Sequence, residues 1–135
     1  MAVRPGLVGI LGQLEAGGLG PHGQLLLEEA RRAAVAGLSL SVVVLLAALA
    51  DVAVQEPTDL PGDLSGDGPD RLGTGYLSAD EVRELDWLRR RRNQILHHDS
   101  PDEARPFALD AAQLEGDAAR AAHAIAPLLD WLGRG

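Results

Sequence analysis

Apolar residues recur at helical spacing along most of the chain. The first such stretch has apolar side chains at positions i, i+3, i+4 and i+7, which form one face of a helix. They are Leu7, Ile10, Leu11 and Leu14. Gly17 and Gly18 follow, and because glycine ends helices readily, the pattern predicts a short first helix closed by these two residues.

Two longer helices are predicted next. The second begins at about Pro21, and Gly37 supplies its C-terminal break. It holds two acids followed by two arginines at spacings that favour ion pairs, namely Glu28, Glu29, Arg31 and Arg32. Ser39 is expected to cap a third helix that runs to about Gln55 and is hydrophobic nearly all round. Such a helix is expected to lie between others, at the core of a bundle.

A polar break separates these helices from the rest of the chain. Residues 56–77 are dense in Pro, Gly and Asp, and they predict a flexible acidic loop that is a candidate for facing a partner. Ser78 and Glu81 form a capping box at the start of a fourth helix. The first turns of this helix are acidic and its end is rich in Arg and His, which is the order that the helix dipole favours.

The last helical region is predicted from about Ala108 to Leu132, with Pro127 kinking or dividing it. No internal repeat and no strand-like alternation of polar and apolar residues accompanies the helices. The sequence therefore predicts an all-α fold, a four-to-five-helix up-and-down bundle that forms a single domain over residues 1–135.

The composition narrows the function classes. The chain has 135 residues and no Cys, so disulfide scaffolds, cysteine zinc sites and thiol catalysis are excluded. It holds 12 Arg, no Lys and 20 acidic residues, for a net charge of -8 at pH 7. An acidic protein of this kind is not a general nucleic-acid coat, so any contact with RNA or DNA must come from a local cluster of Arg.

One stretch, residues 33–54, raises the question of a membrane, because Asp51 is its only charged residue. Its content of Gly, Ser and Ala, and the cost of placing Asp51 in hydrocarbon, favour a buried central helix instead. The N-terminal residues lack the long apolar segment of a signal peptide. We therefore expect a cytoplasmic protein that does not enter a membrane.

The candidate chemistry lies in the fourth helix. On a helical wheel, Arg92 falls in the middle of an apolar sector. That sector holds Leu85, Leu88, Ile95 and Leu96. A guanidinium group is costly to bury alone, so Arg92 is expected to meet a carboxylate, a symmetry mate or an anionic ligand.

The surrounding sequence, RRRRNQILHH, gathers four cations, an amide and two imidazoles in ten residues. Asn93 and His97 are neighbours at i and i+4, and His98 aligns at i+7 with Arg91. Imidazole and guanidinium groups can cleave an RNA phosphodiester without metal, by moving protons and by stabilising the charge of the transition state. The alternative is a solvated face whose Arg and His interact with the helix dipole, and spacing alone favours this alternative at least equally.

Residues 92–97 (RNQILH) resemble the signature of the HEPN domain family (higher eukaryotes and prokaryotes nucleotide-binding), in which an Arg, often followed by a polar residue, precedes a His by a few positions. The order of elements is similar as well. A helix ending in small residues and Gly is followed by a hydrophobic helix with a late acid, a variable loop and a charged helix that ends in the motif. The resemblance covers about residues 21–130, the HEPN-like core of the predicted domain.

The resemblance implies a homodimer of helical bundles in which the Arg and His residues of both subunits line a shared cleft. Many members of the family are metal-independent endoribonucleases of toxin–antitoxin or other defence systems, and others have lost catalysis. Carried over to this chain, His97 is the acid–base group, Arg92 stabilises the transition state, and Asn93 orients the phosphate or the imidazole.

Three further residues, Arg91, His98 and Asp51, are expected to bind substrate. Asp51 stands where many members keep an acid on the preceding core helix, and it is expected to pair with Arg92. Two features depart from the family pattern. Asp99 stands where one subgroup has a Tyr that is nucleotidylated, so such regulation is not implied. A straight helix also places positions 92 and 97 about 140° apart, so their convergence requires fraying, a long Arg reach or the partner subunit.

Other candidate sites are weaker. His22 and His123 have no second ligand at metal-binding spacing, so we expect surface or core histidines, no metal site and no cofactor. Trp87 and Trp131 are expected to anchor packing or the dimer rather than to stack bases. The Gly and Asp residues of the 56–77 loop lack the spacing of a P-loop or an EF-hand.

Three functional hypotheses follow. The preferred one is an RNA-cleaving HEPN-like enzyme with an antitoxin protein as a candidate partner. The second is a non-catalytic HEPN module that binds nucleotide or RNA, or that serves as a dimerisation and partner-docking domain. The third is a membrane-anchored accessory protein, which requires residues 33–54 to insert into a membrane.

Overall fold

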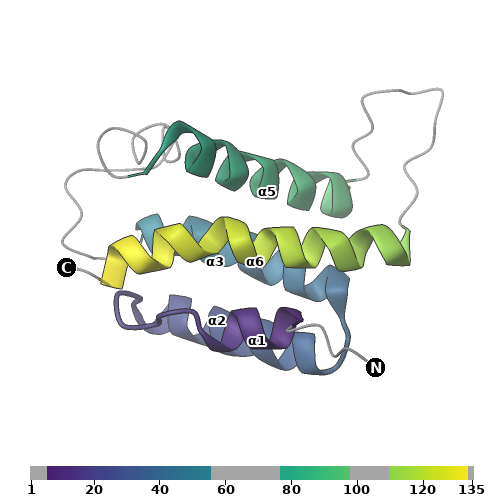
Figure 1. Ribbon diagram of the computed structural model, residues 1–135, viewed down its shortest axis with the longest axis horizontal. Helices are drawn as coiled ribbons and strands as arrows, with labels where there is room; N and C mark the ends of the chain where they lie inside the picture. Colours follow the sequence, from purple (N-terminus) through teal and green to yellow (C-terminus); the bar gives the residue numbers. More distant parts are fainter. Residues whose placement is uncertain (1–5, 56–76, 98–109, 134–135) are drawn as a thin grey trace.

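The computed structural model describes residues 6–55, 77–97 and 110–133. Within these ranges the chain forms five helices and no strand, which confirms the predicted all-α class (Figure 1). The helices are α1 (Leu7–Gly12), α2 (Pro21–Val35), α3 (Ser39–Gln55), α5 (Ala79–His97) and α6 (Ala111–Gly133). The predicted acidic loop lies outside the described residues, except for Leu77, which is buried.

Helix α3 lies at the centre of the bundle. It contacts α2, α5 and α6, while α1 covers α2 and α6. The long helices α2, α3, α5 and α6 alternate in direction along the chain, as the up-and-down prediction requires (Figure 1). Because α3 is apolar nearly all round, it can bury several faces at once, and the prediction that it forms the core is confirmed.

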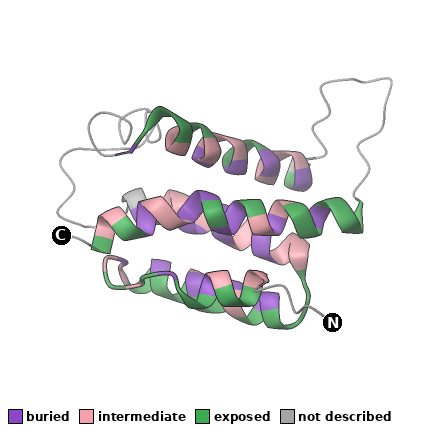
Figure 2. Cartoon of the chain, in the orientation of Figure 1, coloured by how far each residue is buried: buried purple, intermediate pink, exposed green. Residues whose placement is uncertain are grey.

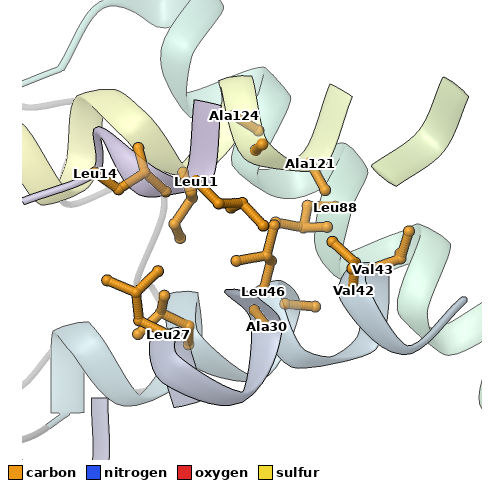
Figure 3. Close-up of a cluster of buried hydrophobic side chains, with 14 of the residues drawn as sticks. Leu11, Leu14, Leu27, Ala30, Val42, Val43, Leu46, Leu88, Ala121 and Ala124 are labelled. Carbon is orange, nitrogen blue, oxygen red and sulfur yellow. The ribbon is translucent and has the colours of Figure 1, made fainter. Parts of the chain in front are cut away.

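The core is built from small and aliphatic side chains contributed by all five helices. Figure 2 shows buried residues along the inward faces of the helices, with exposed residues on the outward faces. Figure 3 shows the interior cluster, in which Leu11 of α1, Leu27 of α2, Leu46 of α3, Leu88 of α5 and Ala121 of α6 are all fully buried. Alanine residues of α2 and α6, among them Ala30 and Ala121, are fully buried in this core.

The turn between α2 and α3 depends on a glycine, as predicted. Gly37 has a φ of 75°, a left-handed conformation that other residues adopt only with strain. It ends α2 in a Schellman motif, in which Leu38 N–H donates to Ala33 O at 2.9 Å and Gly37 N–H donates to Ala34 O at 3.1 Å. The prediction that Ser39 caps α3 is wrong by one position, because Val42 N–H donates to Leu38 O and Ser39 is already helical.

Helix α1 is shorter than the glycine pair suggested. It ends at Gly12, and Arg31 of α2 donates from Nε to Leu11 O at 3.0 Å and from Nη2 to Leu14 O at 2.9 Å. A guanidinium group thus satisfies carbonyl groups at the end of the helix. Of the predicted ion pairs on α2, Arg32 with Glu28 is present at 3.4 Å.

The starts of the last two helices follow local capping chemistry. The predicted capping box of α5 is confirmed, because Ser78 N–H donates to Glu81 Oε1 at 2.8 Å and Glu81 N–H donates to Ser78 Oγ at 3.1 Å. Helix α6 begins at Ala111 rather than near 108, and Asp110 Oδ1 accepts a hydrogen bond from Ala112 N–H at 2.9 Å.

Of the two outcomes expected for Pro127, a kink or a division of α6, division does not occur. The helix runs through Pro127 to Gly133. Leu128 and Leu129 continue its buried face beyond the proline, and their burial outweighs the single lost backbone hydrogen bond.

Among the described helices, none has the length and apolar character that crossing a membrane demands.

Candidate functional site

Arg92 lies at the interface between α5 and α3. Its Nη1 donates to Asp51 Oδ2 in an ion pair, so the predicted pairing of these two residues is confirmed. The side chain of Arg92 is 19% exposed and that of Asp51 is 42% exposed. The charge of this guanidinium group is therefore compensated within the chain while both side chains remain open to solvent.

Asn93 holds the same guanidinium group from a second direction. Its Oδ1 accepts a hydrogen bond from Arg92 Nη2 at 3.3 Å. Two contacts from different elements, Asp51 on α3 and Asn93 on α5, thus fix the plane of the guanidinium group. The structure brings together three of the predicted site residues: Asp51, Arg92 and Asn93.

Arg91 faces a different helix from its neighbour, because consecutive helical residues project about 100° apart. Its Nε donates to Asp117 Oδ2 of α6 at 2.7 Å, and its Nη1 donates to Gln94 Oε1 at 3.1 Å. The side chains of Arg91 and Asp117 are only 8% and 14% exposed. These contacts join α5 to α6, and the substrate-binding role expected for Arg91 stays a prediction.

The helical wheel thus needs correction in two places. It put Arg92 at the centre of the buried sector, but Arg91 is the more deeply buried arginine. It also put Leu96 in that sector, whereas Leu96 is 53% exposed. Helix α5 contacts both α3 and α6. Its buried residues are Leu85, Leu88, Arg91 and Ile95, so the buried sector includes Arg91 in place of Leu96.

The two histidines of the motif are described less fully. His97 is the last residue of α5, and only its place in the helix is described; His98 lies outside the described residues. Position 97 follows position 92 by five residues, or about 140° around the helix axis. Within one subunit, the helical backbone therefore directs these two positions to different sides of α5.

Asp117 is the partner that the sequence reasoning missed. It borders the buried face of α6, which includes Leu114, Ala118 and Ala121. A single acidic residue at the edge of a buried face indicates that a facing helix supplies a cationic partner. The consecutive arginines of α5 were the candidates for that partner. The signal does not say which arginine, because that choice depends on how the two helices are rotated.

A second set of polar contacts joins the outer sides of α5 and α6. Glu84 accepts two hydrogen bonds from Arg120, from Nε to Oε1 at 2.9 Å and from Nη2 to Oε2 at 2.7 Å. These bonds hold the pKa of Glu84 below its usual value and raise the pKa of Arg120. The guanidinium carbon of Arg120 also lies 4.0 Å from the centre of the Trp87 ring, a cation–π contact.

The remaining candidates lie apart from this chemistry. His22 and His123 are both exposed, which agrees with the surface alternative for each. In the three described ranges, no three His, Cys, Asp or Glu side chains gather in an arrangement that would hold a metal ion.

Comparison with known proteins adds no relative. No model of a protein family, no curated protein and no solved structure matches this chain. Support for a function therefore comes from the residues of the chain and from the resemblance of residues 92–97 to the HEPN motif.

Proposed function

We propose that this protein is a HEPN-like, metal-independent endoribonuclease of the cytoplasm that acts in a toxin or another defence system. The observation that supports this proposal most is the fixed guanidinium group of Arg92, held by Asp51 and Asn93 on a helix that ends at His97. Phosphodiester cleavage needs a pre-oriented cation and an imidazole, and this helix carries both residue types.

In the proposed reaction the 2′-hydroxyl of the RNA loses its proton, and its oxygen attacks the adjacent phosphorus. The bond from phosphorus to the 5′-oxygen breaks, and that oxygen takes up a proton. The products are a 2′,3′-cyclic phosphate and a 5′-hydroxyl. His97 moves the protons, Arg92 stabilises the negative charge that builds on the phosphate, and Asn93 orients the phosphate or the imidazole.

The active form is proposed to be a homodimer. Because positions 92 and 97 of one helix diverge by about 140°, the arginine of one subunit and the histidine of its partner are proposed to complete each site. Mixing Arg92→Ala and His97→Ala subunits tests this arrangement. Shared sites regain one intact site per mixed dimer, so cleavage returns, whereas sites built within one subunit stay inactive.

The first test is cleavage of a broad panel of RNAs in EDTA by the parent protein. Arg92→Ala and His97→Ala are expected to abolish cleavage while keeping the helical content of the parent. Arg89→Ala is the matched control, because Arg89 is an exposed arginine of the same helix that pairs with Asp86. Inert parent protein, or activity that survives in the His97 variant, would contradict the proposal.

A second candidate function is a HEPN-like module without catalysis, which binds nucleotide or RNA or docks a partner such as an antitoxin. One observation favours it: Asp51 compensates the charge of Arg92, which weakens the attraction of that group for phosphate. Asp51→Asn separates the two functions. The enzyme is expected to lose cleavage because Arg92 loses its orientation, whereas a binding module is expected to gain affinity for RNA.

A further inference from the structure

A pocket of about 520 Å³ opens along the α6 edge of α5. Its walls combine one indole ring, three guanidinium groups and two carboxylates, from Asp80, Arg83, Glu84, Trp87, Arg90 and Arg120. Arg92 lies elsewhere on α5, where it faces Asp51 of α3. The pocket is therefore separate from the proposed cleavage site.

One wall of the pocket is a flat, cationic and aromatic surface. The guanidinium group of Arg120 is stacked on Trp87, with 4.0 Å between its carbon and the ring centre. Two hydrogen bonds from Arg120 to Glu84 hold that guanidinium group in place. Nucleobases stack on aromatic rings and on guanidinium planes, so this pair offers a surface that is already arranged for a planar base.

The remaining arginine of the lining, Arg90, has no carboxylate to itself. Arg89 and Arg90 share a single carboxylate, that of Asp86, at 2.7 and 3.0 Å. One carboxylate compensates only one of the two cations, and Arg90 is the one that lines the pocket. Each of the other two guanidinium groups of the lining has its own carboxylate partner: Arg83 pairs with Asp80, and Arg120 pairs with Glu84.

We propose that this pocket binds a nucleoside phosphate, with its base against the Trp87–Arg120 pair and its phosphate at Arg90. A nucleotide combines a planar base with an anionic phosphate, and the lining combines a stacked aromatic surface with an arginine that shares its carboxylate. The pocket volume lies within the range of about 300–1,000 Å³ that is typical of small-molecule sites. The bound nucleotide is either free or part of a single RNA strand, since both present the same base and phosphate.

The test uses Trp87 as the reporter in a Trp131→Phe background, which leaves Trp87 as the only indole. Adenosine monophosphate is expected to quench its fluorescence with a saturable dependence on concentration. Adenosine is expected to bind about tenfold more weakly, and inorganic phosphate is expected to cause no quenching. Equal affinity for adenosine and its monophosphate would overturn the role of the phosphate contact.

Two exposed arginines provide matched variants. Arg90→Gln is expected to weaken binding of adenosine monophosphate about tenfold, whereas Arg32→Gln, which removes an exposed cation of α2 that does not line the pocket, leaves binding unchanged. Both residues are exposed, so neither change should disturb the fold, and circular dichroism checks this. Equal losses from both variants would overturn the proposal, because they would mean a diffuse charge effect.

A third arm identifies the source of the nucleotide. A short single-stranded RNA with 2′-O-methyl groups binds without being cut, so the result does not depend on the proposed nuclease activity. Tighter binding of this RNA than of the mononucleotide, again weakened by Arg90→Gln, assigns the pocket to an RNA strand. Equal or weaker binding assigns it to a free nucleotide. Absence of saturable quenching by either ligand would overturn the proposal.

Discussion

Adjacent residues in one helix meet different environments, and the arginine pair of α5 illustrates this. The ion pair of Arg91 with Asp117 has little access to water. The ion pair of Arg92 with Asp51 is more solvated, chiefly because Asp51 is more exposed than Asp117. When one partner of a buried ion pair is removed, the other charge stays buried without compensation, whereas water solvates the remaining charge of an exposed pair. The cost of the same chemical change should therefore differ between the two sites.

Asp117→Asn is expected to lower the free energy of unfolding by about 3 kcal/mol. Asp51→Asn, the matched change at the more solvated pair, is expected to cost about 1 kcal/mol or less. Urea denaturation of both variants beside the parent measures the difference. Equal losses at the two sites would contradict the difference in solvation that separates the two pairs.

The ion pair of Glu84 with Arg120 is expected to make the stability of the fold depend on pH. The hydrogen bonds from Arg120 lower the pKa of Glu84 in the folded protein below 4.5, its usual value. The pair therefore stabilises the fold fully above about pH 4.5, and this stabilisation is lost as the pH falls through the lowered pKa. Because both side chains are well exposed, Glu84→Gln is expected to cost less than about 1 kcal/mol at pH 7.

The measurement compares the unfolding free energies of parent and Glu84→Gln in urea at pH 7 and at pH 3. The difference between them is expected to shrink on acidification, because the parent loses the charged pair that the variant never had. A difference that grows at low pH would show that the sign is wrong.

At the scale of whole elements, the sequence was most informative where a helix boundary depends on local chemistry. The Ser78–Glu81 capping box and the Gly37 break are made by residues close in sequence, so their patterns predict them directly. The sequence left open whether Pro127 kinks or divides α6, because the continuity of this helix depends on burial against other helices. The rotation of α5 could not be predicted for the same reason.

Two glycines of different conformation should respond oppositely to alanine. Gly37→Ala is expected to cost about 1 kcal/mol, because a Cβ is strained at a φ of 75° even though no atom lies near it. Gly9→Ala is expected to stabilise α1 by up to about 1 kcal/mol, because Gly9 is helical and the space beside it is open. Thermal unfolding compares both variants, and shifts of the same sign would contradict this account.

At the scale of the whole molecule, stability is concentrated around α3. Leu46 of α3 is fully buried, whereas Leu25 of α2 is exposed. Leu46→Ala is expected to lower the free energy of unfolding by about 2–5 kcal/mol, and Leu25→Ala by less than about 0.5 kcal/mol. Chemical denaturation measures both, and a small loss from Leu46→Ala would mean that α3 is not the centre of the core.

The candidate site was predictable in part. Asp51 and Arg92 lie on different helices. The apolar sector around Arg92 indicated that this residue needs a partner, and the resemblance to the HEPN family pointed to Asp51 as that partner. The contacts of Arg91 with Asp117 and of Arg120 with Glu84 and Trp87 depend on how α5 and α6 are rotated against each other, which the sequence pattern does not specify. For that reason the pocket beside Trp87 was not anticipated.

The most direct test of the proposed function is the chemistry of the RNA ends formed in EDTA. Cleavage through the 2′-hydroxyl by His97 and Arg92 predicts 2′,3′-cyclic phosphate and 5′-hydroxyl ends from the parent protein, and no such ends from the Arg92→Ala variant. Ends bearing a 3′-hydroxyl and a 5′-phosphate, or cyclic-phosphate ends that persist in that variant, would contradict the proposal.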